Sequence, residues 1–365
     1  RSHVVMDKDN IAAIVKGDKT IELAKWKLPE LKNNDVLLSI SAVGICGSDL
    51  KYWAYGKCGR FNLEGKPMVI GHEAAGVVVQ VGSSVKSLQV GDRVAIEPGV
   101  SCKTCSHCKS GRYNLCPEMR FCATPPVHGN LCQYFVHDAD FCFKLPPNVS
   151  DEEGAMIEPL SVAVHTCRRA CVTSGHHVLI FGCGPIGILC GLVAKHYGAT
   201  QVTIVDIDQD RLEVAKKLGA ADVVHKATTT DNDPVTFAHT LREVANDDGS
   251  HAALECSGAD ISLKTAVHAS RPGGCVLLVG RGSMDVPMPM VAAGTYEIDI
   301  RGIFRYANTY PEAIELVSSG AVDVASLVTH RFTLQKAGDA FTTAVSPKEK
   351  AMKVMIKCSA DDHRS

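Results

Sequence analysis

The amino-acid sequence predicts an α/β protein with two domains, a β-rich domain and a doubly wound parallel sheet. Its 365 residues, 45% of them hydrophobic, are enough to bury two cores. Short apolar runs separated by turn-forming residues recur through roughly the first 150 positions, a pattern typical of β-strands. From residue 177 the pattern becomes strand, glycine-rich turn, helix and strand, which favours a parallel sheet.

The β-rich part contains candidate metal ligands beside its predicted strands, which lie at residues 12–15, 36–40, 77–81 and 93–96. His72 and Glu73 follow Gly71 where a loop enters a strand, and we interpret them as half of a catalytic zinc site. The alternative is a polar turn before a core strand. Cys46 lies between glycines at the end of another strand. A lone cysteine is more often a core residue, but these candidate ligands in the same region favour a role for its thiol.

Four cysteines form a second, more compact pattern at Cys102, Cys105, Cys108 and Cys116. Two successive two-residue gaps allow thiolates from one short loop to surround a tetrahedral ion, and the fourth cysteine completes the shell. This spacing predicts a structural zinc site. A nucleic-acid-binding zinc ribbon is the competing interpretation, but it lacks a second cysteine cluster and a basic surface, since the formal net charge is -2.

Two further segments of the β-rich part carry candidate site residues. Residues 120–129 are rich in Pro and Gly and form a predicted loop, which could line a pocket through Phe121 and Thr124 or could simply cover the surface. A predicted helix at 151–165 carries Glu158 among apolar neighbours. A buried carboxylate needs a cation or a hydrogen-bond partner, and a metal ion would serve.

A dinucleotide-binding fingerprint opens the second domain. The predicted strand 177–181 and helix 188–197 flank a glycine-rich turn, and the next strand, 201–205, ends at Asp206 before a helix at 209–218. Such glycines let a pyrophosphate approach the N-terminus of the helix. The acid accepts hydrogen bonds from ribose hydroxyls and repels a 2′-phosphate, so NAD is favoured over NADP although Arg211 lies nearby. The turn comprises Gly182, Cys183, Gly184, Pro185, Ile186 and Gly187.

Later strands at 252–256, 275–279 and 299–304 extend the parallel sheet. Val279, Gly280 and Arg281 lie where a nicotinamide would bind, although a strand-ending turn has the same composition. Arg305 and Tyr306 could face hydroxyl groups or could be surface residues.

Composition excludes several functional classes. No run approaches the roughly 20 apolar residues of a membrane span, and the N-terminus lacks a secretory pattern. Many of the 16 cysteines stand alone in apolar context, as Cys190 does, which indicates reduced core residues. We therefore expect a cytoplasmic protein that binds a small molecule rather than nucleic acid or a membrane.

The motifs together resemble the zinc-containing medium-chain dehydrogenases, most closely the polyol branch of the sorbitol dehydrogenase type. The zinc signature G-H-E-x-x-G, followed after five residues by G-x-x-V, is matched at residues 71–85; further matches lie at 44–49, 121–126, 158–161, 182–187 and 304–306. The resemblance implies a GroES-like catalytic domain from residues 1–160 and 303–365 and a Rossmann NAD-binding domain at 161–302. It also implies an active site between the two domains and a homotetramer.

The resemblance also implies roles for individual residues. It makes Cys46, His72 and Glu73 the catalytic zinc ligands, with Glu158 in contact through water and Ser48 or Glu158 on the path of the leaving proton. Polyol contacts would be Tyr52, Phe121, Thr124, Glu158, Arg305 and Tyr306. Cofactor contacts would be Gly182, Gly184, Pro185, Ile186, Gly187, Asp206, Arg211, Val279, Gly280, Arg281, Ile303, Phe304 and Arg305.

Two points of this assignment stay open. Adjacent side chains on an extended strand diverge, which favours Glu158 as third ligand, whereas the glycines could let the turn bring both His72 and Glu73 to one ion. The resemblance favours Glu73 and two zinc ions per subunit. Many relatives carry His where this chain has Lys51, which puts a proton relay through that position in doubt.

The activity implied is oxidation of sorbitol, or a related polyol such as xylitol, to its ketose, fructose for sorbitol, with hydride transfer to NAD. Alternatives are an NADP-preferring ketose reductase or a dehydrogenase of xylitol, L-arabinitol or threonine. A non-catalytic, dinucleotide-binding structural protein is the alternative from another class.

Overall fold

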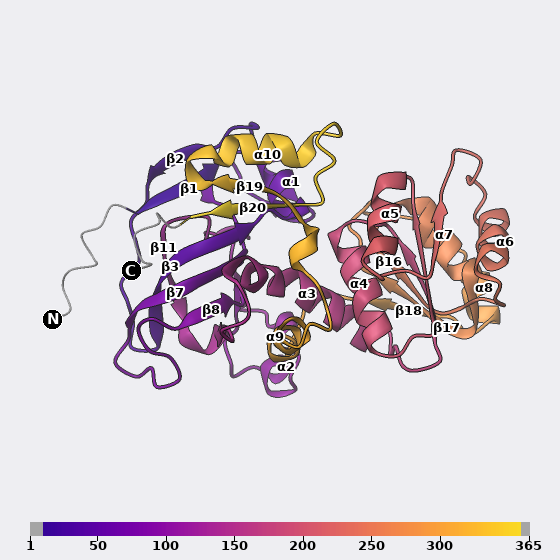
Figure 1. Cartoon of the computed structure of the whole chain (residues 1–365), viewed down its shortest axis with the longest axis horizontal. Helices are drawn as coiled ribbons and strands as arrows, with labels where there is room; N and C mark the ends of the chain where they lie inside the picture. Colours follow the sequence, from indigo (N-terminus) through magenta and orange to yellow (C-terminus); the bar gives the residue numbers. More distant parts are fainter. Residues whose placement is uncertain (1–9, 359–365) are drawn as a thin grey trace. The chain divides into compact units, whose positions relative to one another are not determined.

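The computed structural model describes residues 10–358, which form two compact units (Figure 1). Unit 1 joins the chain up to Glu158 with the chain from Val324 onward, and unit 2 is Pro159–Asp323. The division falls inside helix α3 (Asp151–Arg169), at a proline that lacks the backbone donor of a helix interior. The α/β class is confirmed. The domain limits at 160 and 303 stay a prediction, and the segment 303–323 groups with unit 2.

Unit 1 is built on a seven-stranded sheet. Strand β3 (Asp35–Gly44) lies inside this sheet and is buried from Val36 onward. It pairs antiparallel with β7 (Glu73–Val81), and the register places Gly44 opposite Glu73. The C-terminal strand β20 (Lys353–Lys357) pairs with β3 as well. The strand order is β12 (Cys142–Lys144), β8 (Arg93–Ile96), β7, β3, β20 and β19 (Val328–Thr333), with β11 (Tyr134–Asp138) also paired to β3.

Smaller elements complete unit 1. Helix α1 (Gly47–Tyr55) packs on α10 (Ala337–Val345) through Trp53 and Phe341, whose ring centroids lie 5.9 Å apart. Figure 1 shows α10 alongside β19 and β20. The other strands are β1 (Ile11–Val15), β2 (Glu22–Lys25), β4 (Lys57–Cys58), β5 (Phe61–Asn62), β6 (Met68–Val69), β9 (Gly99–Val100) and β10 (Arg120–Phe121), and the short helix α2 is Ser106–Lys109.

Unit 2 contains the predicted doubly wound sheet, with six parallel strands. Their order is β15 (Val223–Lys226), β14 (Gln201–Asp206), β13 (His177–Phe181), β16 (Ser250–Glu255), β17 (Ser270–Leu278) and β18 (Asp299–Gly302). Strand order reverses at β13, and in such sheets ligands bind at the carboxyl ends of the strands beside this point. The predicted cofactor residues lie at the carboxyl ends of strands or in the turns and first helical turns that follow them.

Helices cover both faces of this sheet. Figure 1 shows α4 (Pro185–His196) and α5 (Gln209–Lys217) on one side. On the other side lie α6 (Pro234–Ala245), α7 (Asp260–Ala269) and α8 (Met290–Thr295), and α9 (Tyr310–Ser318) follows β18. Because apolar side chains on both faces of β13 and β14 are buried, their sequences are continuous apolar runs.

The strand predicted at 299–304 ends earlier than expected. Strand β18 stops at Gly302, and Ile303 and Phe304 lie in the loop before α9. The Gly302 carbonyl accepts a hydrogen bond from Arg169 at 3.2 Å instead of continuing the ladder. Arg305 has a left-handed φ of 55°, which is incompatible with a strand.

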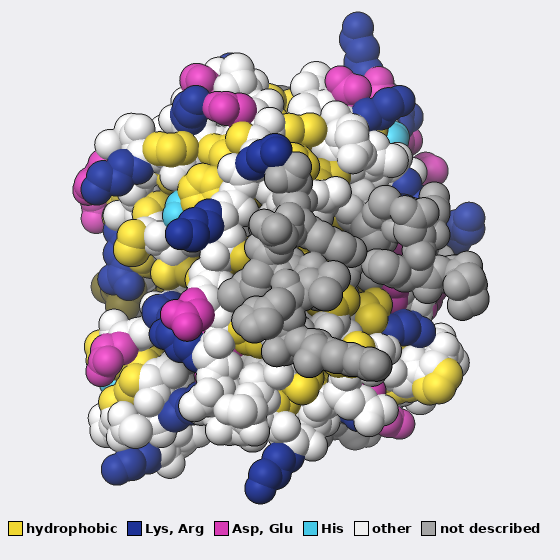
Figure 2. Space-filling model, turned by 90° about the vertical axis from the view of Figure 1, so that its left-hand side faces the viewer, with side chains coloured by type: hydrophobic (Ala, Val, Ile, Leu, Met, Phe, Trp, Pro, Cys, Tyr) yellow, Lys and Arg dark blue, Asp and Glu magenta, His cyan; other side chains and the backbone are white. Residues whose placement is uncertain are grey.

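No helix among the described residues is long and apolar enough to cross a membrane. On the face drawn in Figure 2, basic and acidic side chains are interspersed among apolar and uncharged ones rather than gathered into one basic area. This distribution agrees with the near-neutral net charge and offers no basic surface for nucleic acid on the described part of that face.

Candidate active site and metal centres

Three predicted ligands meet in unit 1. One ligand atom each from Cys46, His72 and Glu73 lies within 4.8 Å of the others. Cys46 caps the N-terminus of α1 just after β3, His72 directly precedes β7, and Glu73 is the first residue of β7. A thiolate, an imidazole and a carboxylate are a suitable set of three protein ligands for zinc, and such a set leaves a fourth position open.

Two glycines make this arrangement possible. Gly71 has a left-handed φ of 93°, which turns the chain sharply before His72. Gly44 faces Glu73 across the β3–β7 pair, and a Cβ at this position would collide with the Glu73 carboxylate oxygen Oε2. The absence of a side chain at Gly44 therefore creates the space for the carboxylate.

Asp49, which sequence reasoning missed, orients two of the ligands. Its Oδ1 lies 3.2 Å from His72 Nδ1, and its Oδ2 accepts a hydrogen bond from the Cys46 amide at 3.0 Å. With Nδ1 directed at Asp49, the other ring nitrogen of His72 is left for a metal. Burial alone would lower the pKa of His72, but the charges of Asp49 and Cys46 raise it well above its usual value. Protons and metal therefore compete for this ring.

A buried lysine balances the charge of Glu73. Lys353 Nζ lies 2.9 Å and 2.6 Å from the two carboxylate oxygens, and it donates to the Ile45 carbonyl at 3.2 Å. Both side chains are almost fully buried. Burial would lower the pKa of Lys353, but the Glu73 carboxylate outweighs it and raises this pKa. Sequence reasoning missed Lys353 because nothing around it in the chain indicates a partner 280 positions away.

Glu158 lies close to this cluster without joining its ligand set. Its side chain is buried, and its charge contributes to the raised pKa of Lys353. A further carboxyl group, Glu97, follows β8 and accepts a hydrogen bond from the Tyr113 hydroxyl at 2.8 Å. Burial, reinforced by the charge of Glu158, raises the pKa of Glu97 to about 8 despite the bond from Tyr113. Glu97 is therefore mostly neutral near pH 7.

Other predicted residues of unit 1 lie at defined positions. The ring of Phe121 is 5.9 Å from that of His72, so it borders the metal cluster. The Ser48 hydroxyl lies 3.3 Å from Cys46 Sγ. Tyr52 is buried on α1, which also carries Lys51, and Thr124 stands in a tight turn closed by a 2.8 Å bond from the Val127 amide. Arg305 and Tyr306 belong to unit 2.

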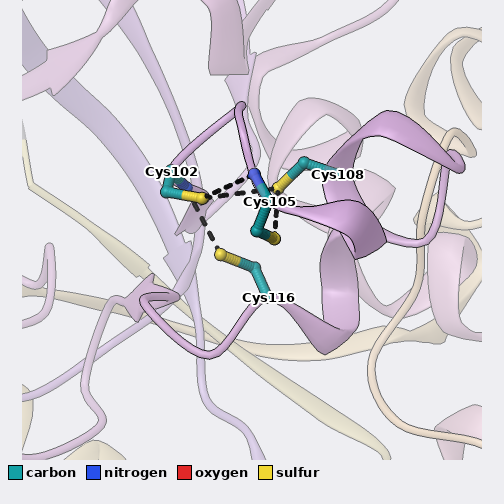
Figure 3. A group of neighbouring side chains, drawn as sticks. All are labelled: Cys102, Cys105, Cys108 and Cys116. Atoms are coloured by element: carbon teal, nitrogen blue, oxygen red, sulfur yellow. Dashed lines mark hydrogen bonds between the residues drawn. The ribbon is translucent and has the colours of Figure 1, made fainter.

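The four cysteines form the predicted compact cluster (Figure 3). Their sulfur atoms point toward a common centre, with Sγ–Sγ distances of 3.9 Å between Cys102 and Cys108 and 3.5 Å between Cys105 and Cys108. Two sulfurs bound to one tetrahedral zinc ion would be about 3.8 Å apart. The backbone amides of Thr104 and Cys105 lower the pKa of Cys102 to about 6, whereas burial raises the pKa of Cys116 to about 12. The residues therefore fit a closed structural zinc site.

The glycine-rich turn of unit 2 has the geometry that the fingerprint requires. Gly182 has a left-handed φ of 97°, and a Cβ on Gly187 would collide with the Gly182 carbonyl oxygen. Gly184 caps α4, and Pro185 and Ile186 form its first turn. The amides at this helix start are available for a pyrophosphate.

Asp206 is fixed at the end of β14 by main-chain donors. Its Oδ2 accepts from the Cys183 amide at 2.5 Å, and its Oδ1 accepts from the Asp208 amide at 2.9 Å. Arg211 Nη1 lies 3.9 Å from where a Cβ on Gly184 would be, so this guanidinium faces the glycine-rich turn. The carboxylate and the guanidinium therefore both lie beside the glycine-rich turn.

Glu255, which sequence reasoning missed, organises the loops near Val279, Gly280 and Arg281. Its backbone carbonyl accepts from the amides of Val279 at 3.0 Å and Gly280 at 2.7 Å. Its side chain accepts from the Ser257 and Gly258 amides at 2.9 Å and 2.8 Å. Burial nevertheless raises the pKa of Glu255. The one sequence feature that could have indicated its role is the position of Glu255 at the end of a predicted strand.

Two family models match the chain. The alcohol dehydrogenase GroES-like domain matches residues 32–147, and the zinc-binding dehydrogenase matches residues 185–319. The first stretch contains both metal-ligand clusters of unit 1, and the second contains most of the sheet of unit 2.

Curated relatives match nearly the whole chain. The sorbitol dehydrogenase of Rattus norvegicus is 48% identical over 354 residues, which cover 97% of this chain and 97% of that protein. The sorbitol dehydrogenase of Homo sapiens is 48% identical over 356 residues, with 97% of both proteins covered. Among solved structures, L-idonate 5-dehydrogenase from Escherichia coli matches with a TM-score of 0.85 and 30% identity, covering 96% of this chain and 98% of that chain.

We expect Lys353→Met to lower the free energy of unfolding by roughly 3–5 kcal/mol, because the buried Glu73 carboxylate loses its cation. Urea denaturation of the metal-free protein measures this change, because bound zinc would supply Glu73 with another cation. Lys86→Met is the matched control, since Lys86 is exposed. Equal unfolding midpoints for the two variants would show that Lys353 does not balance Glu73.

Proposed function

This chain belongs to the zinc-dependent medium-chain dehydrogenases of the sorbitol dehydrogenase type, and we propose that it oxidises sorbitol and related polyols such as xylitol to ketoses. Membership makes it a polyol dehydrogenase with zinc and NAD as cofactors. The cluster of Cys46, His72 and Glu73 carries the proposal, because it supplies three ligands of the types that catalytic zinc sites use.

The residues and cofactors of the site have separate roles in the proposed reaction. Bound zinc would lower the pKa of the substrate hydroxyl, and bound NAD would accept the hydride from the carbinol carbon. Asp49 holds the His72 ring in place, and the Phe121 ring lies beside it. The hydroxyl of Ser48 and the carboxylate of Glu158 are the proposed groups for moving the proton away.

We assign Glu73 as the third ligand and Glu158 as a neighbour that contacts the metal through water. The grouping of Glu73 with Cys46 and His72 supports this assignment, and the space at Gly44 explains how the carboxylate turns toward them. The pair with Lys353 does not compete fully, because a carboxylate has about four lone-pair sites.

Glu73→Gln should reduce bound zinc from two ions to about one per subunit, because an amide is a poorer zinc ligand than a carboxylate. Glu158→Gln should retain two ions and lose activity. Metal analysis of purified protein distinguishes the two variants, with Glu30→Gln as an exposed control. Loss of zinc in Glu158→Gln and its retention in Glu73→Gln would reverse the assignment.

Cofactor preference and the polyol contacts in unit 2 are also part of the proposal. The Asp206 carboxylate supports NAD over NADP, because its negative charge opposes a 2′-phosphate. Arg305 and Tyr306 follow the last strand of the sheet and are proposed to contact polyol hydroxyls. Tyr52, Phe121 and Thr124 of unit 1 are likewise proposed as polyol contacts.

The zinc-loaded protein should form NADH from NAD with sorbitol, and chelation of the metal should abolish the reaction. Absorbance of NADH measures the rate with sorbitol, xylitol, L-arabinitol and threonine, and NADP is compared at equal concentration. A higher kcat/KM for another substrate, or for NADP, would select the corresponding alternative.

A zinc-replete protein that oxidises no polyol and reduces no ketose would contradict the proposed activity. Retained binding of NAD in that case would favour a non-catalytic dinucleotide-binding protein.

We also propose that the chain forms a homotetramer. Strand β18 is an edge of the sheet in unit 2, so one side of its backbone is available for pairing. Large apolar side chains of the connection between β17 and β18 are exposed as well, namely Met284, Met290, Val291 and Tyr296. Exposed apolar side chains next to an edge strand are typical of an interface between copies.

Light scattering should give a molar mass four times that of the 39.0 kDa chain. Val291→Glu should lower this mass, because it places a charge in the proposed interface. The same mass for Val291→Glu and wild type would exclude this surface, and a monomeric wild type would contradict the assembly.

A cytoplasmic location completes the proposal. All sixteen cysteines are free thiols, and a reducing compartment keeps such thiols reduced. Recovery of the protein from a secreted or membrane fraction would contradict this location.

A further inference from the structure

The loop at residues 303–309, between β18 and α9, has a backbone that needs support. It carries Arg305 and Tyr306, which the proposed function assigns to the polyol, and Phe304, which the family resemblance assigns to the cofactor. Arg305 and Asn308 both have left-handed φ values, 55° and 57°. Residues other than glycine adopt this conformation at a cost, so surrounding contacts must maintain it.

Both ends of this loop are attached to the last turn of α3. Arg168 Nη1 donates to the carbonyl of Asn308 at 2.7 Å, where the chain enters α9. Arg169 donates to the carbonyl of Gly302 at 3.2 Å, where the chain leaves β18. Arg301 donates back to the Arg169 carbonyl at 3.0 Å. The side chains of Arg168 and Arg169 thus hold the carbonyls of Asn308 and Gly302, at the two ends of the loop.

Arg168 also fixes the helix that follows the loop. Its Nη2 pairs with Glu312 Oε2 in the first turn of α9, and the other oxygen of Glu312 accepts a hydrogen bond from the Tyr197 hydroxyl. Burial and the Glu312 charge raise the pKa of Tyr197, so its hydroxyl stays protonated and donates. One guanidinium therefore joins the loop carbonyl and α9, and Tyr197 connects α9 to the end of α4.

Helix α9 also contacts Tyr306 directly. Tyr310 begins α9, and its ring centroid lies 5.8 Å from that of Tyr306. Both rings are buried. A shift of α9 would therefore move the ring against which Tyr306 packs, because buried side chains leave little room for independent movement.

We propose that Arg168 is a positioning residue of the reaction: through Asn308 and Glu312 it holds the loop so that Arg305 and Tyr306 face the polyol. The proposal rests on the proposed function. A guanidinium suits this role because its planar fork has donors for two acceptors on different elements, whereas an ammonium is a point charge. The pair with Glu312 is partly exposed, with side-chain exposures of 39% and 29%, so it contributes little to overall stability.

The test compares Arg168→Gln with Lys195→Gln in the zinc-loaded enzyme. Lys195 forms a similarly exposed ion pair with Asp222 in the same unit but has no contact with the loop among its hydrogen bonds. Arg168→Gln should raise KM for the polyol roughly tenfold, as expected for loss of charged hydrogen bonds. Its kcat should change less than its KM for the polyol, and Arg168→Lys should recover part of the loss.

Amide hydrogen exchange tests the position of the loop without measuring enzyme activity. Amides of residues 303–309 should exchange faster in Arg168→Gln than in wild type or Lys195→Gln, with the same unfolding midpoint. Unchanged exchange, or faster exchange with unchanged KM for the polyol, would overturn the proposal. The proposal would also be overturned if KM for the polyol rose in Arg168→Gln only together with a fall in the unfolding midpoint. A wild-type enzyme inactive on every polyol would instead overturn the proposed function, and exchange alone would then show whether Arg168 holds the loop.

Discussion

The buried carboxylate of Glu73 is the constraint on which the rest of unit 1 depends. A negative charge in the interior needs a cation nearby, and Lys353 of the C-terminal strand β20 is that cation. This strand must therefore return to the side of β3, where Lys353 also binds the carbonyl of Ile45, next to Cys46. One ion pair thus connects the end of the chain to two of the candidate zinc ligands.

Unit 2 stabilises its acids by different means. Asp206 and Glu255 accept hydrogen bonds from backbone amides in the loops that follow β13, β14 and β16. Main-chain donors are fixed by the fold, so these carboxylates hold the loops in shape. The carboxylate of Asp206 can accept hydrogen bonds from a ribose with free hydroxyls, whereas it would repel a 2′-phosphate.

Sequence reasoning succeeded where the determinants are close together in the chain. Strand β13 begins and ends as predicted, and the four-cysteine cluster follows from spacing within one short segment. Partners distant in sequence carried no local signal, as with Lys353 for Glu73 and Tyr113 for Glu97. The end of β18 was missed for the same reason, because Arg169 of α3 takes the carbonyl that would extend the ladder.

The four-cysteine lobe is expected to be structural, because a complete shell of four thiolates has no position for substrate. The lobe supplies Tyr113, whose hydroxyl binds Glu97, and Lys103, which pairs with Asp138 and Asp140. Burial keeps Glu97 mostly protonated near neutral pH, with a pKa of about 8. The hydrogen bond from Tyr113 acts in the opposite direction, because it favours the charged form of Glu97, whereas the charge of Glu158 raises the Glu97 pKa further. The lobe is therefore coupled through Tyr113 and Glu97 to Glu158 without binding any reactant.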